Sequence, residues 1–283
     1  MNVLIAGGSG QLGRDMQNLF QKNLIDYSAP DSKKLDISDL GAVRRFLREN
    51  QTDVIVNCAA YNAVDLAETE WRTAFQVNGL GVRNLAVAAN QADASMVHFS
   101  TDYIFNGLSN RPYTIADSPS PINRYGESKL LGETFIRDLM DRFILIRTSW
   151  VFGSGNSNFP KKVIDWSCNK KELKIVSDQI ASPTYTVDLA RATLDIVTRE
   201  AFGTYHVTNS GYCSRFEWAA YILKQIGWDG NLYPATSDEF PVPAQRPPFS
   251  ALDNFGFKEI TGYLLPEWKD ATTRFLSDLG LIV

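Results

Sequence analysis

A glycine-rich segment near the start of the chain constrains the fold more than any other feature. Gly7-Gly-Ser-Gly-Gln-Leu-Gly13 follows a short apolar run, residues 3–6, and precedes a helical spacing of apolar residues over 11–21. Glycines at 8, 10 and 13, or at 7, 10 and 13, allow a tight turn and a close approach of a pyrophosphate at a helix N-terminus. The segment predicts a strand–turn–helix that binds a dinucleotide. The expected contacts are Gly7, Gly10, Gln11, Leu12 and Gly13.

Short apolar runs alternate with helical patterns over the first 150 residues. Residues 25–28, 53–57, 96–100 and 143–147 predict strands, and residues 39–50, 68–91 and 126–140 predict helices. The strand segments are apolar throughout, which is typical of parallel strands covered on both faces. We expect an α/β fold, a Rossmann-like doubly wound parallel sheet with a small C-terminal substrate-binding lobe. The expected ranges are 1–152 plus about 176–210 for the NAD(P)-binding domain, and about 153–175 plus 211–283 for the lobe.

The segment after the second predicted strand bears on the choice of cofactor. An acidic residue there typically binds the ribose of an adenosine, and Asp26 and Asp31 are the candidates. Two lysines at 33 and 34 suit a 2′-phosphate instead, so NADH and NADPH both stay open. Asp36 and Ile37, which follow shortly after, are expected to border the adenine. The expected contacts are Asp31, Asp36 and Ile37.

A tyrosine and a lysine stand four residues apart at the start of a predicted helix. Tyr125 and Lys129 therefore share one helix face. An ammonium beside a phenol favours the phenolate and makes the proton easier to give up. Tyr125 is thus a candidate general acid for a developing alkoxide, and Lys129 a candidate for holding the ribose of a nicotinamide.

Polar side chains follow two other predicted strands at their carboxyl ends, where ligands bind in open α/β sheets. Thr101 and Asp102 come directly after the strand at 96–100. Thr101 is a candidate to donate a hydrogen bond to a substrate carbonyl, and Asp102 is a candidate to orient a sugar hydroxyl or to support the proton transfer. After the strand at 53–57, the small residues Cys58, Ala59 and Ala60 would let a cofactor lie against the backbone. Asn62 follows them and is a candidate substrate contact.

Charge and cysteine usage exclude several classes of function. The net charge is −4 and no run of basic residues is longer than a pair, which does not support binding to nucleic acid or to an anionic membrane. Three widely spaced cysteines fit no metal site and no disulfide framework, so no metal is predicted. The apolar run at the N-terminus is too short for a signal peptide. We expect a cytoplasmic protein.

Ten segments together resemble the dTDP-4-dehydrorhamnose reductase family of extended short-chain dehydrogenases/reductases. The resemblance covers nearly the whole chain and is far more specific than any single motif. Its segments are GGSGQLG at 7–13, LDISD at 35–39, VNCAAY at 56–61, VDLAE at 64–68, STDYIF at 100–105, PINRYGESK at 121–129, RTSWVFG at 147–153, DQIASPT at 178–184, GTYHV at 203–207 and RPPFS at 246–250.

The resemblance implies reduction of dTDP-4-dehydro-L-rhamnose to dTDP-L-rhamnose with NADPH or NADH, for a cell-surface or spore polysaccharide. It implies Thr101, Tyr125 and Lys129 as a catalytic triad assisted by Asp102. It further implies that Trp150 flanks the sugar of the nucleotide-sugar substrate and that Arg246 lies near its diphosphate. The oligomeric state is not set by the sequence, and a homodimer is one alternative.

Two departures from the family pattern and two rival functions stay open. Asn62 stands where members often have Thr, and Gly79 and Gly81 make one predicted helix unusually rich in glycine.

The first rival function is that of another nucleotide-sugar reductase, epimerase or dehydratase. A dehydratase usually has a second carboxylate where this chain has Tyr103. The second rival is a non-catalytic cofactor-binding subunit, which the presence of both Tyr125 and Lys129 disfavours.

Overall fold

A parallel sheet forms the centre of the structure, a computed structural model that describes residues 1–155 and 157–282. Within these residues the sheet has six strands in the order β10-β5-β4-β3-β1-β2. The strands are β1 (Asn2–Ala6), β2 (Asp26–Ser28), β3 (Val54–Asn57), β4 (Ser95–Thr101), β5 (Phe143–Thr148) and β10 (Gly203–His206). All neighbours run parallel. The chain winds outward in both directions from β1, so the predicted doubly wound sheet is confirmed.

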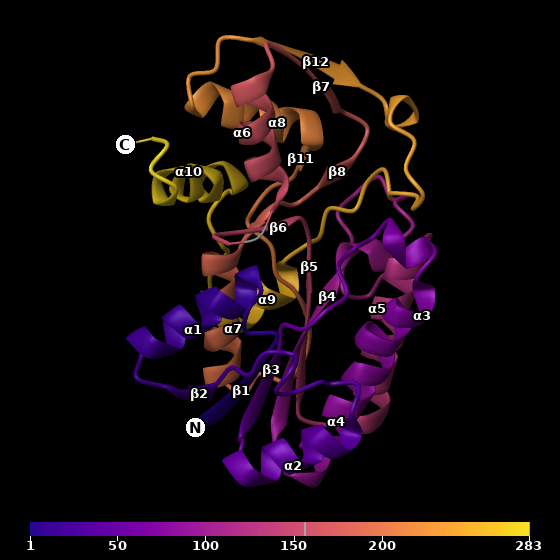
Figure 1. The fold of residues 1–283 in the computed structure, drawn as a ribbon, viewed down its shortest axis with the longest axis vertical. Helices are drawn as coiled ribbons and strands as arrows, with labels where there is room; N and C mark the ends of the chain where they lie inside the picture. Colours follow the sequence, from indigo (N-terminus) through magenta and orange to yellow (C-terminus); the bar gives the residue numbers. More distant parts are fainter. Residues whose placement is uncertain (156, 283) are drawn as a thin grey trace.

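Helices cover both faces of the sheet, as Figure 1 shows. One face carries α1 (Gln11–Lys22), α7 (Thr186–Thr198) and α9 (Phe255–Thr261). The other carries α2 (Leu40–Asn50), α4 (Val82–Gln91) and α5 (Arg124–Leu139). The central strands β1, β3, β4 and β5 are largely buried between these two layers, which explains why their sequences are mostly apolar on both faces, whereas the edge strand β2 is partly exposed and polar.

The long helix expected over 68–91 is interrupted. It consists of η1 (Leu66–Glu68), α3 (Trp71–Phe75), the π-helical segment η2 (Gln76–Gly81) and α4. The side chain of Asn78 in η2 accepts from the backbone N–H of Tyr61 at 2.8 Å and donates to Ser128 Oγ at 3.0 Å. Gly79 leaves room for Leu131 of α5, whose side chain a Cβ atom would meet at 2.6 Å. Tertiary contacts, which periodicity does not register, therefore select the wider helical turn.

A smaller body lies beyond the carboxyl ends of the sheet strands (Figure 1). Its elements are β6 (Val151–Phe152), α6 (Phe159–Asn169), β7 (Glu172–Val176), β8 (Ile180–Ala181), β9 (Thr184–Tyr185), β11 (Cys213–Ser214), α8 (Arg215–Gln225), β12 (Asn231–Ala235) and α10 (Trp268–Asp278). Two one-turn helices, η3 (Asp102–Ile104) and η4 (Ser237–Glu239), complete the fold. Buried aromatic rings of Phe152, Trp218 and Phe275 form the core of this body. Asn156 and Val283, within the predicted lobe ranges, lie outside the described residues.

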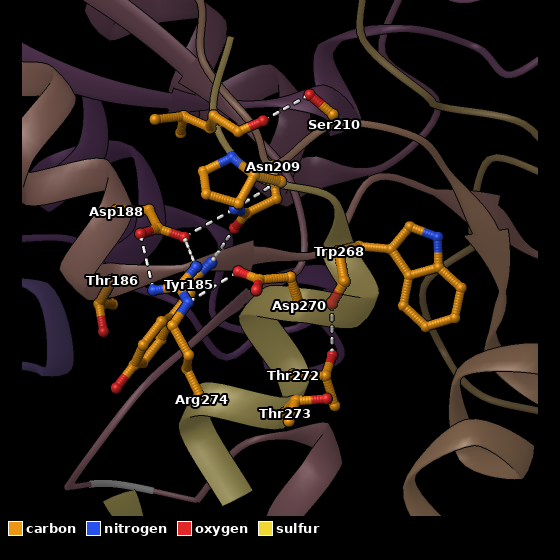
Figure 2. A network of polar contacts seen from close by, with 12 residues as sticks. Tyr185, Thr186, Asp188, Asn209, Ser210, Trp268, Asp270, Thr272, Thr273 and Arg274 are labelled. Atoms are coloured by element: carbon orange, nitrogen blue, oxygen red, sulfur yellow. Dashed lines mark hydrogen bonds and ion pairs between the residues drawn. The ribbon is translucent and has the colours of Figure 1, made fainter. Parts of the chain in front are cut away.

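A polar network joins the smaller body to the sheet (Figure 2). Arg274 of α10 donates to both carboxylate oxygens of Asp188 in α7, at 2.9 and 2.6 Å. Asp188 also accepts from Asn209 at 2.7 Å, and Asn209 in turn accepts from the backbone N–H of Tyr185 at 2.8 Å. A bidentate guanidinium–carboxylate pair fixes orientation as well as distance, so it fixes the position of α10 relative to α7.

Candidate active site

Two glycines that tolerate no side chain shape the loop between β1 and α1. Gly7 has a φ of +78°, and a Cβ atom there would lie 2.5 Å from the backbone nitrogen of Ala59. A Cβ atom on Gly13 would lie 2.5 Å from the carbonyl oxygen of Gly7. Gly10 is the N-cap of α1 and contributes no side-chain cap. The backbone N–H groups of the first helical turn are therefore available to an anion.

The side chain of Gln11 points from this loop to the smaller body. Its Oε1 accepts from the backbone N–H of Gly153 at 3.1 Å and from Asn158 Nδ2 at 2.7 Å. Asn158 is the N-cap of α6. Gln11 therefore connects the glycine-rich loop to the segment that follows β6, and its amide oxygen is already engaged within the protein.

The cap of α5 places Tyr125 and Lys129 on one face of that helix. Asn123 Oδ1 accepts from the backbone N–H of Gly126 at 2.8 Å, which starts the helix at Arg124. Tyr125 Oη lies 3.5 Å from Asn62 Oδ1, at the limit of a hydrogen bond. Lys129 is buried, and its Nζ donates to the carbonyl oxygen of Phe99 in β4 at 2.6 Å.

Thr101 and Asp102 are placed where β4 passes into η3. Thr101 Oγ1 accepts from the backbone N–H of Tyr103 at 3.1 Å and donates to Asp102 Oδ1 at 3.2 Å. Asp102 is only 3% exposed, and its second oxygen accepts from Ser250 Oγ at 2.5 Å. The carboxylate is thus held at both oxygens, while the long bond from Thr101 leaves that hydroxyl able to turn to another acceptor.

Burial sets the protonation of three of these groups. It raises the pKa of Asp102 to about 6 and lowers that of Lys129 to about 8. It also raises the pKa of Tyr125 above its usual range, an effect that a hydrogen bond with Thr101 only partly opposes. Burial therefore dominates the pKa of Tyr125, the Lys129 ammonium donates to Phe99, and the expected influence of Lys129 on Tyr125 stays a prediction. Tyr125 is a protonated phenol at neutral pH, which is the form that an acid needs.

One cavity of about 420 Å³ brings the predicted groups together. Its wall includes the glycine-rich loop, the small residues after β3, the end of β4 and the first turns of α5. The predicted residues on it are Gly10, Gln11, Leu12, Gly13, Cys58, Ala59, Ala60, Asn62, Thr101, Asp102, Tyr125, Lys129 and Trp150. The topological switch point between β1 and β3 opens into this cavity, which agrees with the general position of ligand sites in such sheets.

Three of the expected adenosine contacts lie outside the lining of that cavity. Asp31 is exposed, and its Oδ1 accepts from the backbone N–H groups of Lys33 and Lys34 at 3.1 and 2.9 Å. Asp36 Oδ1 accepts from the backbone N–H of Ser38 at 2.8 Å. Ile37 is buried in the core between α2 and α4. Each side chain thus has a local structural role, and contact with a cofactor stays a prediction for all three.

The two residues expected at the nucleotide sugar differ in their surroundings. Trp150 lies on the cavity wall with its ring stacked on Trp218 at a centroid distance of 5.8 Å. Arg246 donates to Asp65 Oδ2 at 2.9 Å and to the carbonyl oxygen of Ala244 at 2.7 Å. It lines a different cavity, and its role at a diphosphate stays a prediction.

Sequence reasoning missed two side chains at the site. Arg215, the first residue of α8, lies on the cavity wall with its guanidinium carbon 3.6 Å from the ring centroid of Trp150. Ser250 donates to Asp102 from 148 positions further along the chain. Neither residue belongs to a helical or strand pattern that points to the cavity. The motif at 246–250 includes Ser250 and was the only available signal for it.

The cysteines and acidic residues show no further site within the described part of the chain. Cys58, Cys168 and Cys213 are free, and burial raises the pKa of Cys58 to about 12, so that it is a neutral thiol. No cluster of three or more His, Cys, Asp or Glu side chains there is placed to hold a metal ion. Among the same residues, no helix has the length and apolar character needed to cross a membrane.

Comparisons with known proteins agree with this geometry. A curated relative, the spore coat polysaccharide biosynthesis protein SpsK of Bacillus subtilis, is 37% identical, covering 98% of this chain and 97% of its own. A crystal structure of a dTDP-4-dehydrorhamnose reductase from Clostridium acetobutylicum superposes with a TM-score of 0.96 at 39% identity, covering 99% of this chain and 100% of that chain. The same enzyme from Bacillus anthracis, solved in complex with NADP, gives a TM-score of 0.95 at 36% identity, with 98% and 99% coverage.

The family assignment rests on the whole chain and not on one motif. Residues 1–281 match the family described as RmlD substrate binding domain. The structural likeness spans both the sheet and the smaller body, since it covers nearly all of each chain. The chain therefore belongs to the RmlD family of dTDP-4-dehydrorhamnose reductases, the family that its sequence resembles.

Proposed function

We propose that this chain reduces the C4 keto group of dTDP-4-dehydro-L-rhamnose to give dTDP-L-rhamnose, with NADPH or NADH as the reductant. Relatives named dTDP-4-dehydrorhamnose reductase match this chain over nearly their full length. The observation that carries the proposal is the shared cavity of Thr101, Tyr125 and Lys129 beside the glycine-rich loop. The name of the Bacillus subtilis relative supports a place in making a polysaccharide precursor.

The residues of the cavity fit a nicotinamide dinucleotide. The uncapped first turn of α1 offers N–H groups for the pyrophosphate. Ser100 Oγ and Thr148 Oγ1 are buried on the cavity wall and have no hydrogen-bond partner among the described residues. Such orphaned hydroxyls call for a ligand with polar groups. When bound, the cofactor would supply the hydride, and the exposed lysines at 33 and 34 would be the residues to hold the 2′-phosphate of NADPH.

Tyr125 and Thr101 act on the oxygen of the keto group. Tyr125 Oη donates a proton to that oxygen as negative charge develops on it, because the phenol is protonated at neutral pH. Thr101 Oγ1 turns from Asp102 to donate a hydrogen bond to the same oxygen. Asp102 stays held by Ser250, and the oxygen that Thr101 leaves free can accept from a sugar hydroxyl.

Lys129 holds a charge where the cofactor ribose would bind. Its ammonium is fixed on Phe99 and has two further N–H groups for the ribose hydroxyls. On the other side of the cavity, the smaller body carries the nucleotide sugar, with Trp150 and Asn62 at the sugar ring. We propose the sheet and the smaller body as the cofactor and substrate domains respectively.

The test is reduced nicotinamide consumption with dTDP-4-dehydro-L-rhamnose, comparing the parent chain with Tyr125→Phe. We expect kcat to fall by about 10²- to 10⁴-fold in the variant, with an unchanged Kd for the cofactor. Near-normal turnover would refute Tyr125 as the acid. If the parent returns its cofactor unchanged after turnover, the chain is a cofactor-recycling epimerase or dehydratase instead. The ratio of rates with NADPH and NADH measures the cofactor preference.

A further inference from the structure

Two cavities meet at Arg215. The first is the candidate active site, and the second, of about 370 Å³, is lined by aromatic rings of the smaller body. Gln11, Trp150, Val151 and Arg215 line both. Arg215 presents its guanidinium carbon 3.6 Å from the ring centroid of Trp150 and 4.7 Å from that of Phe159. A molecule that extends from one cavity into the other must pass this guanidinium.

Arg215 lacks the carboxylate partner that a half-buried arginine usually has, and its neighbours are aromatic rings and the side chain of Tyr103. Within residues 1–155 and 157–282 no carboxylate forms an ion pair with it, whereas Arg246 is paired with Asp65 at 2.9 Å. Burial lowers the pKa of Arg215 to about 10, and the positive charge of Arg246 acts in the same direction. Arginines that are desolvated and near one another are stabilised by an anion between them.

The local charge balance also favours an anion. Arg215, Arg246 and the exposed Lys162 border this region, and Lys162 lies close enough to Asp65 to lower the pKa of that carboxyl. Asp65 is already paired with Arg246, and Asp102 is buried and hydrogen-bonded to Ser250. Asp178 and Asp238 line the neighbouring cavity of Arg246 and not the two cavities that meet at Arg215. A diphosphate brings two negative charges and matches the planar donor set of a guanidinium.

The backbone of Trp150 supports a ligand at the same point. Trp150 has a φ of +42°, in the left-handed region that bulky residues rarely adopt. Such a conformation is strained for a bulky residue and is found mainly at ligand clamps and active sites. It places the Trp150 ring on the wall of both cavities and under Arg215.

We infer that Arg215 binds the diphosphate of the nucleotide-sugar substrate and so positions the sugar between Trp150 and Tyr125. The inference rests on the proposed function. It assigns the diphosphate to a guanidinium that carries no carboxylate partner in the described structure, instead of to the paired Arg246 alone. The aromatic rings beyond Arg215 then offer stacking faces to the nucleoside.

The test compares dTDP with thymidine by titration calorimetry on the parent, Arg215→Met and Arg215→Lys. The methionine variant keeps the volume and loses the charge. We expect its Kd for dTDP to rise about 10- to 100-fold while the Kd for thymidine changes less than about threefold. Arg215→Lys should fall between the parent and the methionine variant, because it keeps the charge without the bidentate donors. A purely structural role would weaken both ligands equally, and that result would overturn the inference.

Two controls separate the possible failures. Arg48→Met, an exposed arginine on α2 beside a different cavity, should leave dTDP binding unchanged. Arg246→Met tests the rival: if it abolishes dTDP binding while Arg215→Met does not, the diphosphate belongs to Arg246. Cofactor binding, measured on each variant, shows that the fold is intact. If the parent binds cofactor but not dTDP, the proposed function fails and this inference with it.

Discussion

A buried ion pair joins the helix that carries Tyr125 and Lys129 to the neighbouring strand, and its removal should be severe. Glu133 of α5 and Arg147 of β5 are 0% and 1% exposed. Arg147 donates to both carboxylate oxygens, at 3.1 and 2.8 Å. Glu133 also accepts from Arg137 at 3.0 Å. No other carboxylate in the described residues reaches Arg147, so Glu133→Gln leaves a buried guanidinium without its counter-charge.

The expected loss of stability follows from this geometry. Removing one partner of a buried pair costs about 3–5 kcal/mol, because the remaining charge stays desolvated. At about 2 °C per kcal/mol for a chain of this length, Tm should fall by about 6–10 °C. The matched control is Glu127→Gln on the same helix, whose pair with Arg124 is solvent-exposed. That pair is worth about 0–1 kcal/mol, so its Tm should move by less than about 2 °C.

Calorimetry and urea unfolding of the two variants, with cofactor absent, measure the difference. A second variant that replaces both partners, Glu133→Leu with Arg147→Met, should be more stable than Glu133→Gln, because no charge is left buried. If Glu133→Gln is no less stable than Glu127→Gln, the pair does not act as a desolvated unit and the argument is refuted.

Two pH dependences follow from other buried groups. Burial lowers the pKa of Lys129 to about 8, so Lys129 should lose its charge above pH 8 and kcat/KM should fall in that range. Because Glu133 stabilises the charged form of Lys129, the fall should begin at a lower pH in Glu133→Gln. An alkaline fall at the same pH in that variant and in the parent would contradict this role of Lys129. His206 is buried and its pKa is lowered to about 3 from 6.5, so the unfolded chain takes up a proton below pH 6.5 that the folded chain refuses. Between pH 7 and pH 5, His206 should therefore lower the free energy of unfolding by about 2 kcal/mol. Asp102 should raise it by about 1 kcal/mol over the same range, because its raised pKa lets the folded chain bind a proton more readily than the unfolded chain. Unfolding free energies at the two pH values measure the balance, and a gain in stability at pH 5 would refute it.

The sheet and its loop were predictable because their signals are local. An apolar run, a glycine turn and a helical spacing follow one another within the first 21 residues, and each is set by backbone sterics or by burial of the same segment. The pairing of Tyr125 with Lys129 on one face likewise needs only the helical repeat. Such features survive without knowledge of the tertiary fold.

The interruption of the predicted helix at 68–91 shows where local reasoning ends. The sequence marked Gly79 and Gly81 as unusual, but not what they make room for. In the structure, Gly79 makes room for the side chain of Leu131 on another helix, and Asn78 in the same segment forms hydrogen bonds with Tyr61 and Ser128. These partners are brought together only when β3 and α5 are already in place, so no window of sequence contains the cause.

The same limit explains why the residues proposed to bind the substrate were harder to predict than those proposed to bind the cofactor. Cofactor contacts come from the carboxyl ends of strands and the helix starts that follow them, where position in the fold implies position at the site. On the substrate side, Arg246 reaches Asp65 across 181 residues, and Arg215 reaches Trp150 across 65 residues (215 − 150). A family motif can identify Arg246 from the sequence, but whether its charge is already paired depends on that distant contact. The charge left without a carboxylate partner is that of Arg215, and only the folded arrangement of both arginines shows the difference.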